Sequence, residues 1–335
     1  SNISVVERES ELAGLPPDIL LTRLEAYTKD GTFTGQYHGP GRGDLEHSFE
    51  QNLAELYARA DTPRLSGVQI KAPMYLDPAG TLAPSTGKPF THILKPAGTS
   101  GFEALPVVEW LGMELGRAAG LAVPSTALVK MPDGMPPALI VERFDIRDAL
   151  DDKRMLALED LCSVLDLSPD AKYSATMERV ARAVRPLSTE PEEDILIILK
   201  RALFAWLVAD GDMHLKNMAL LKTAGSGDTT FRIVRMAPLY DALTTRVFPR
   251  LDKDRLALKL SGKDDNLDRG DFRTFASTVG LKVSDADAAI DAMLKQLALA
   301  LDRVVLPKGL HYEQTSEKAA SQVLDLCRRR VEAFG

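Results

Sequence analysis

The chain has 335 residues, of which 45% are hydrophobic and 27% are charged, and its formal net charge is −7 at pH 7. This composition is that of an ordinary globular protein, and the length allows two lobes with separate cores. The negative charge argues against strong nucleic-acid binding by the whole surface, so DNA contact is expected only through a partner. Because no apolar run approaches a bilayer span and no signal-peptide pattern opens the chain, we expect a cytoplasmic protein without membrane contact.

Zinc binding and disulfide formation are not expected from this sequence. The five His residues show no spacing typical of metal ligands. Cys162 and Cys327 lie far apart inside helical patterns, so reduced thiols in the core are expected rather than a disulfide.

Residues 1–60 are predicted to form a helical and glycine-rich extension ahead of the first lobe. Apolar residues recur at helical spacing over residues 17–27 and again over residues 45–60. The intervening residues 31–43 are polar and rich in glycine, which is typical of a loop.

Residues 61–145 are predicted to form a small mixed lobe. Short runs with β character at 91–95 and 138–142 flank one helical pattern at about 103–120. Over residues 146–335 the patterns are almost entirely helical, apart from a hairpin that follows Asn217. The sequence therefore predicts an α+β fold with two lobes, a small mixed α/β N-terminal lobe and a larger, mostly helical C-terminal lobe.

A short segment ahead of the first of these strands has the composition of a loop that approaches phosphate. One glycine and one small hydroxyl residue allow close contact between backbone N–H groups and an anion. An ordinary turn would have the same composition, so both interpretations stay open. The segment consists of Ser66, Gly67, Val68 and Gln69.

Lys95 ends the first of the two β-like runs, where a strand can direct its ammonium group toward phosphates. A solvated lysine at a strand end is the commoner arrangement. If Lys95 binds phosphate, its partner is expected on the following helix, with Glu109 as first choice and Glu114 as second. The second run leads into a polar connector where main-chain groups can bind a nucleotide base, and Phe144 is either a contact there or a core residue.

Asp212, Asn217 and Asp241 have the spacing of the residues that carry phosphoryl transfer in protein kinases. In that arrangement the first Asp orients the acceptor hydroxyl and accepts its proton, while Asn and the later Asp hold Mg²⁺ on the phosphates. The preceding residues 195–209 are apolar nearly all round, which indicates a buried helix that leads into the Asp210 loop. The alternative is that both loop Asp residues are solvated and that Asn217 belongs to a turn.

Seven sequence blocks occur in a fixed order: Ser-Gly-Val-Gln-Ile-Lys71, Thr-His-Ile-Leu-Lys95, Glu109 with Gly-Leu-Ala-Val-Pro124, Val-Glu-Arg-Phe-Asp145, Glu159-Asp-Leu-Cys-Ser-Val-Leu165 with Lys172-Tyr173, Asp212-Met-His-Leu-Lys-Asn217 and Ala-Pro-Leu-Tyr-Asp241. Together they resemble the HipA family of bacterial serine/threonine kinases, the toxins of toxin–antitoxin modules. The resemblance is dense over residues 61–265 and loose over the C-terminal helices.

The resemblance implies a cytoplasmic protein kinase that uses ATP and Mg²⁺. Its implied substrate is a protein such as an aminoacyl-tRNA synthetase, and its implied partner is an antitoxin with a DNA-binding domain. The implied roles are phosphate binding by Lys95 with Glu109, main-chain contacts to adenine by Glu142 and Phe144, catalysis by Asp212 with His214 beside the phosphates, and metal binding by Asn217 and Asp241. His214 equally suits a structural role in its loop.

The chain departs from the family at three places. Members often carry Ser-x-Ser-Gly at the phosphate loop and are stopped by autophosphorylation of the first Ser, but here Arg64 stands there and only Ser66 remains as an acceptor. A long β-rich subdomain usually precedes the loop, whereas the short segment here resembles HipT-type toxins, in which a separate small subunit replaces it. Leu158 stands where relatives often have His or Gln.

Three other functions stay open. A pseudokinase or scaffold would keep the fold without transfer, although the joint presence of Lys95, Asp212, Asn217 and Asp241 argues against it. A small-molecule kinase would use the same lobes and metal groups with a different substrate groove. A transcriptional corepressor would need a partner for DNA contact, because the chain shows no helix-turn-helix pattern.

Overall fold

The computed structural model describes residues 28–43, 70–98, 101–147, 154–224 and 230–334. The helices expected at 17–27 and 45–60 lie outside these residues, as do Ser66, Gly67, Val68, Gln69 and Arg64. Within the described part of the chain, no helix combines the length and the apolar character that a membrane span requires.

The small lobe contains an eight-stranded sheet with the strand order β1-β2-β7-β8-β6-β4-β5-β3. The runs at 91–95 and 138–142 form neighbouring antiparallel strands, as predicted. The strands are β1 (Thr28–Lys29), β2 (Thr32–Phe33), β3 (Gln36–Tyr37), β4 (Ala72–Leu76), β5 (Thr81–Pro84), β6 (His92–Lys95), β7 (Thr126–Val129) and β8 (Ala138–Glu142).

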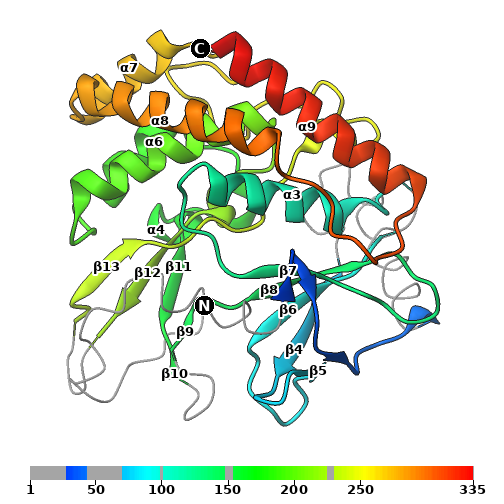
Figure 1. The fold of residues 1–335 in the computed structure, drawn as a ribbon. Helices are drawn as coiled ribbons and strands as arrows, with labels where there is room; N and C mark the ends of the chain where they lie inside the picture. Colours follow the sequence, from blue (N-terminus) through cyan, green and yellow to red (C-terminus); the bar gives the residue numbers. More distant parts are fainter. Residues whose placement is uncertain (1–27, 44–69, 99–100, 148–153, 225–229, 335) are drawn as a thin grey trace.

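Strands β2 and β3 pair with opposite sides of the sheet although only two residues separate them. β2 runs parallel to β7, and β3 runs parallel to β5. The sheet therefore curls until the short N-terminal strands connect both of its edges (Figure 1). Gly35 permits this crossing, because a Cβ atom there would lie 2.1 Å from the carbonyl oxygen of Gly80. Part of the predicted glycine-rich stretch thus belongs to the sheet.

Helix α3 (Leu105–Ala118) corresponds to the helical pattern at 103–120 and lies between the sheet and the C-terminal helices (Figure 1). It packs against β7 and β8 on one side and against α8 and α9 on the other. Almost all of its side chains are buried for this reason. Helix α3 is therefore held by both lobes.

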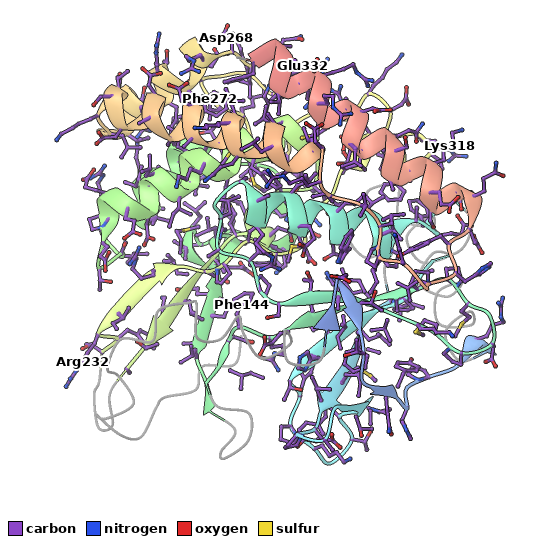
Figure 2. All side chains as sticks on the ribbon, in the orientation of Figure 1. Phe144, Arg232, Asp268, Phe272, Lys318 and Glu332 are labelled. Atoms are coloured by element: carbon purple, nitrogen blue, oxygen red, sulfur yellow. The ribbon has the colours of Figure 1, made fainter. Side chains whose placement is uncertain are left out.

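The large lobe is built around helix α6 (Pro191–Val208), which is apolar on nearly every face and packs against α5, α7, α8 and α9. Pro191 at its first position and three acidic residues in its first turn favour helix initiation. On α7, the fully buried Phe272 contacts Phe334 of α9 edge-on within the helical layer (Figure 2). The other helices are α4 (Leu161–Val164), α5 (Met177–Val184), α7 (Arg269–Val279), α8 (Val283–Leu301) and α9 (Gln314–Phe334).

The large lobe also contains more β structure than the sequence predicts. Strand β11 (Ala157–Asp160) pairs antiparallel with β12 (Ala219–Thr223), which pairs with β13 (Ile233–Met236). Two shorter strands, β9 (Ile146–Arg147) and β10 (Arg154–Met155), form a ribbon after the small lobe. The hairpin expected after Asn217 is present as β12 and β13, but β11 was not predicted, because it is short and its partner lies about sixty residues later in the chain.

Candidate active site

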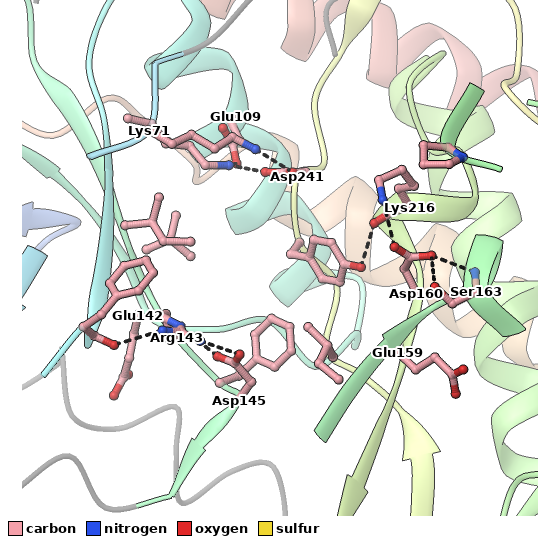
Figure 3. A pocket seen from close by; sticks show the side chains of 18 residues that line it. Lys71, Glu109, Glu142, Arg143, Asp145, Glu159, Asp160, Ser163, Lys216 and Asp241 are labelled. Carbon is pink, nitrogen blue, oxygen red and sulfur yellow. Dashed lines mark hydrogen bonds and ion pairs between the residues drawn. The ribbon is translucent and has the colours of Figure 1, made fainter. Parts of the chain in front are cut away.

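A cavity of about 630 Å³ opens between the two lobes (Figure 3). The small lobe contributes the side chains of Lys71, Lys95 and Glu109 to its wall, and the large lobe contributes Lys216, Tyr240 and Asp241. The cavity therefore lies where the sequence places the phosphate-binding lysine, its carboxylate partner and the later Asp.

Lys95 lies at the end of β6 with only 3% of its surface exposed. Its ammonium group donates to Oε1 of Glu109 and to Oδ1 of Asp241. Burial alone would lower the pKa of Lys95, but the Asp241 and Glu109 carboxylates outweigh burial and raise it above its usual value. Lys95 is therefore a buried, charged link between the two lobes and not a solvated residue at a strand end.

The choice between the two candidate carboxylates on α3 follows from their contacts. Glu109 is 1% exposed and bonds to Lys95, whereas Glu114 contacts Arg117 and Thr126. Burial raises the pKa of Glu109, and the Lys95 ammonium opposes that rise. The structure thus brings Glu109, and not Glu114, to Lys95.

Two glycines on α3 allow the segment that carries Asp241 to lie directly against the helix. Gly112 and Gly116 follow Glu109 by three and seven positions, so all three residues share one helix face. A Cβ atom at Gly112 would lie 2.2 Å from the carbonyl oxygen of Ala242, and one at Gly116 would lie 2.6 Å from Cδ2 of Leu239. These close approaches set the position of Glu109 relative to Asp241.

We predict that Gly112→Ala lowers the free energy of unfolding by about 1–3 kcal/mol, because a backbone oxygen cannot move aside as a side chain can. Alanine is the better helix former by about 1 kcal/mol, and the clash has to outweigh that gain. Thermal melting with and without nucleotide measures both stability and site integrity. Gly43→Ala is the matched control, since its Cβ would meet nothing within 4 Å. An unchanged melting temperature for Gly112→Ala would contradict the packing argument.

Helix α6 leads through a tight turn into the loop that carries Asp212. The helix ends at Ala209, which has left-handed backbone angles with φ of 56°. Gly211 follows, where a Cβ atom would lie 2.0 Å from Oδ2 of Asp254. Its N–H donates to Oγ1 of Thr245 at 3.2 Å, which joins the turn to the chain beyond Asp241. The loop is therefore fixed directly ahead of Asp212.

The two acidic residues of this loop are buried and not solvated. Asp210 and Asp212 are 2% and 7% exposed. Oδ1 of Asp210 accepts the N–H of Asp212 at 2.9 Å, and burial, with the nearby Asp212 charge, raises the pKa of Asp210 well above its usual value. The hydroxyl of Tyr173 donates to Oδ1 of Asp212 at 2.6 Å. Burial raises the pKa of Asp212 to about 6, and the Tyr173 hydrogen bond opposes this rise.

His214 lies beside Asp212 with 2% of its surface exposed. Its Nε2 is 3.8 Å from Oδ1 of Asp212, and its ring meets Tyr173 edge-on. Neither ring nitrogen has a hydrogen-bond partner among the described residues. Burial lowers the pKa of His214 to about 4, so the imidazole is neutral near pH 7. Both the phosphate-side role and the structural role are compatible with this position.

Asn217 and Asp241 are the residues predicted to hold a metal. Nδ2 of Asn217 donates to the main-chain oxygen of Asp212 at 2.9 Å, which leaves its Oδ1 to act as a ligand. Asp241 has left-handed backbone angles with φ of 52° and a side chain that is 25% exposed. Within the described residues, His, Cys, Asp and Glu side chains form no group of three or more able to hold a metal. One carboxylate and one amide oxygen fit Mg²⁺, which commonly takes its other ligands from water and phosphates.

In this structure the Asp241 carboxylate accepts hydrogen bonds from two lysines. Lys95 bonds to Oδ1, and Lys71 bonds to Oδ2 at 3.2 Å (Figure 3). Burial opposes ionisation of Asp241, but the two ammonium groups outweigh it and hold the pKa of that carboxyl far below its usual range. Sequence reasoning missed the contact with Lys71, and its only signal was the position of that lysine directly before β4.

The side of the cavity away from Asp241 is formed by the end of β8 and the connector that follows it. Glu142 ends β8, and Phe144 lies between the two lobes, where its ring is 5.6 Å from that of Tyr240 (Figure 2). Arg143 bonds to Asp145 at 2.7 Å and to the carbonyl oxygen of Phe90 at 3.2 Å. The connector after β8 thus forms one wall of the cavity, which is where the main chain was expected to bind a base. The sequence did not predict that Tyr240 lines the cavity beside Phe144.

The chain is similar to known proteins over most of its described length. Residues 64–301 match the family described as HipA-like C-terminal domain. The protein named “Putative kinase Y4mE” of Sinorhizobium fredii is 30% identical over 248 residues, which are 72% of this chain and 56% of that protein. “Putative kinase Y4dM” of the same organism is 28% identical over 266 residues, with 75% and 62% covered. The chain thus spans less than two thirds of the length of these relatives.

A solved structure has the same fold. It is the complex of the Shewanella oneidensis MR-1 toxin–antitoxin system HipA, HipB and its operator DNA, with a TM-score of 0.69, 19% identity, and coverage of 86% of this chain and 70% of that chain. The predicted α+β fold with two protein-kinase-like lobes is therefore confirmed. Because the family match covers well over half of the sequence, this chain belongs to the HipA-like C-terminal domain family.

Proposed function

We propose that the chain is a serine/threonine protein kinase that depends on ATP and Mg²⁺. The observation that carries the proposal is the junction at Lys95, whose ammonium group bonds to Glu109 of the small lobe and to Asp241 of the large lobe in one cavity. A Lys–Glu pair beside a carboxylate that can bind metal is the arrangement that positions phosphates for transfer. The family and the relatives named as kinases support the same activity.

We assign roles to six residues in and beside the cavity. Lys95, steadied by Glu109, holds the phosphates of the nucleotide, and main-chain groups at Glu142 and Phe144 bind its base. Asn217 and Asp241 would hold Mg²⁺, which neutralises charge on the phosphates when it is bound.

Asp212 is the residue that would face the acceptor hydroxyl. Its carboxylate, fixed by Tyr173, accepts the hydroxyl proton as the oxygen attacks the terminal phosphate. Burial keeps bulk water away from this carboxylate. We assign the general-base role to Asp212 and not to Asp210, because Asp210 uses Oδ1 to hold the N–H of Asp212.

The biological setting is proposed on the same basis. The solved relative is a HipA found with HipB and operator DNA. We propose that this chain is likewise a cytoplasmic toxin restrained by a DNA-binding antitoxin, with a translation protein such as an aminoacyl-tRNA synthetase as substrate.

Phosphate transfer to protein tests the proposal. Purified chain is incubated with radiolabelled ATP, Mg²⁺ and a bacterial lysate, in parallel with the Asp212→Asn variant and with a chelated sample. We expect label on Ser or Thr of one or a few proteins, and none in either control. Label found only on small molecules would support a small-molecule kinase, and the absence of any label with retained ATP binding would support a pseudokinase.

A further inference from the structure

Two lysines of unequal burial share the carboxylate that is proposed to hold the metal. Lys95 is 3% exposed and is also bonded to Glu109, whereas the Lys71 side chain is 48% exposed and pairs with Asp241 alone among the described carboxylates. Figure 3 shows Lys71 reaching Asp241 from the side of the small lobe. Because each carboxylate oxygen already accepts from an ammonium group, a metal that binds Asp241 would compete with the two lysines for that carboxylate.

Breaking the pair between Lys71 and Asp241 costs less free energy than breaking the pair between Lys95 and Asp241. An ion pair with one partner about half exposed shifts an equilibrium by roughly fivefold or less, because water and salt screen it. Removing one partner of a buried pair shifts it by more than about a hundredfold, since a charge is left without compensation. Lys95 also keeps Glu109 as a partner if it loses Asp241. The metal therefore replaces Lys71 and leaves the Lys95–Glu109 pair intact.

The other cations on the cavity wall are held by different carboxylates. Among the described lining residues, Arg143 pairs with Asp145 at 2.7 Å and Lys216 pairs with Asp160 at 2.9 Å. Lys71 differs from both because its carboxylate is the proposed metal ligand itself. Once the metal takes that carboxylate, the Lys71 ammonium loses its partner at the moment when the phosphate charge enters the cavity.

We propose that Lys71 is an exchangeable cation of the nucleotide site, which occupies Asp241 while the site is empty and binds the nucleotide phosphates after the metal has displaced it. This inference rests on the proposed kinase function. It gives the empty site a balanced charge, with two ammonium groups against Glu109 and Asp241. Metal binding and phosphate binding would also favour each other. A metal on Asp241 frees Lys71 to bind the phosphates, and phosphates that bind Lys71 remove the cation that competes for Asp241.

The proposal predicts effects of opposite sign when Lys71 is replaced by Met. Without nucleotide, the variant should bind Mn²⁺ up to about fivefold more tightly than the wild type, because no ammonium group competes for Asp241. With Mn²⁺ present, it should bind ATP about tenfold more weakly, because a charge-assisted contact to phosphate is lost. A lysine with a purely structural role would not move the two affinities in opposite directions.

Titration of the full chain tests this directly, with Mn²⁺ followed by electron paramagnetic resonance and ATP followed by calorimetry. Lys263→Met is the matched control, because the Lys263 side chain is 46% exposed and pairs with an Asp, Asp271, away from the lining of the cavity. Its Mn²⁺ affinity should equal that of the wild type. Melting curves identify any variant that does not fold, and Lys71→Gln then replaces Lys71→Met.

Two results would overturn the inference, and a third would show instead that the proposed function is wrong. Unchanged or weaker Mn²⁺ binding by Lys71→Met, with normal wild-type binding of ATP and Mn²⁺, would show that Lys71 does not compete for Asp241. Unchanged ATP affinity would show that Lys71 does not bind phosphate. If the wild type binds neither ATP nor Mn²⁺, the proposed nucleotide site itself is wrong.

Discussion

Asp212→Asn is expected to leave nucleotide binding intact and to lower phosphate transfer by about 10²–10⁴-fold, the usual contribution of a positioned general base. The amide keeps the shape of the carboxylate and can still accept the Tyr173 hydroxyl, but it cannot take a proton from the acceptor. Asp241→Ala is expected to act differently, by weakening Mg²⁺-dependent ATP binding about tenfold or more, because it removes the only carboxylate proposed to hold the metal. Calorimetry with ATP and a transfer assay on both variants measure the separation.

Backbone strain needs a control in this comparison, since Asp241 has left-handed angles that alanine tolerates poorly. Asp133→Ala provides it, because Asp133 also has a positive φ, of 56°, and is exposed outside the cavity. It should bind ATP as the wild type does. If Asp212→Asn retained near-normal transfer to any acceptor, Asp212 would not be the base. If Asp241→Ala retained Mg²⁺-dependent binding, the metal would lie elsewhere.

The sequence predicted the elements whose signal is local. Helices α3 and α6 follow from apolar periodicity, and strands β6 and β8 follow from short β-branched and apolar runs bounded by turns. Strand β11 was missed because four residues carry little periodicity, and its pairing depends on a hairpin far along the chain. The curling of the sheet through β2 and β3 was missed for the same reason, since each of these strands has only two residues.

The sequence also predicted only part of the candidate site. Residue type and order singled out Lys95, Glu109 and Asp241, and the structure places all three in contact. The type and order of these residues did not reveal how far their side chains are buried. For Lys95 the sequence left two interpretations open, a phosphate-binding lysine and a solvated lysine at a strand end. Only the approach of the segment around Asp241 to α3 shows that the side chain is enclosed. Gly112 carried no sequence signal, because a glycine within a helix does not reveal which backbone lies against it.

Burial of Lys95 determines the outcome of its replacement. Lys95→Met keeps the apolar stem of the side chain but removes the ammonium group, so the buried Glu109 carboxylate loses its bonded cation and Asp241 keeps only the exposed Lys71. We expect phosphate transfer to fall below detection and the free energy of unfolding to fall by about 3–5 kcal/mol, the usual cost of breaking a buried pair by removing one partner. Chemical denaturation and the transfer assay check the two effects separately.

A second substitution separates stability from catalysis at this site. Adding Glu109→Gln to Lys95→Met removes the buried charge that has lost its cation, so the double variant should regain part of the lost stability. It should regain no transfer, because the ammonium group that holds the phosphates is still missing. If the single variant were as stable as the wild type, Lys95 would not be part of a buried charge network. If the double variant recovered transfer along with stability, the loss of activity in Lys95→Met would reflect unfolding, and Lys95 would have no direct role in binding phosphate.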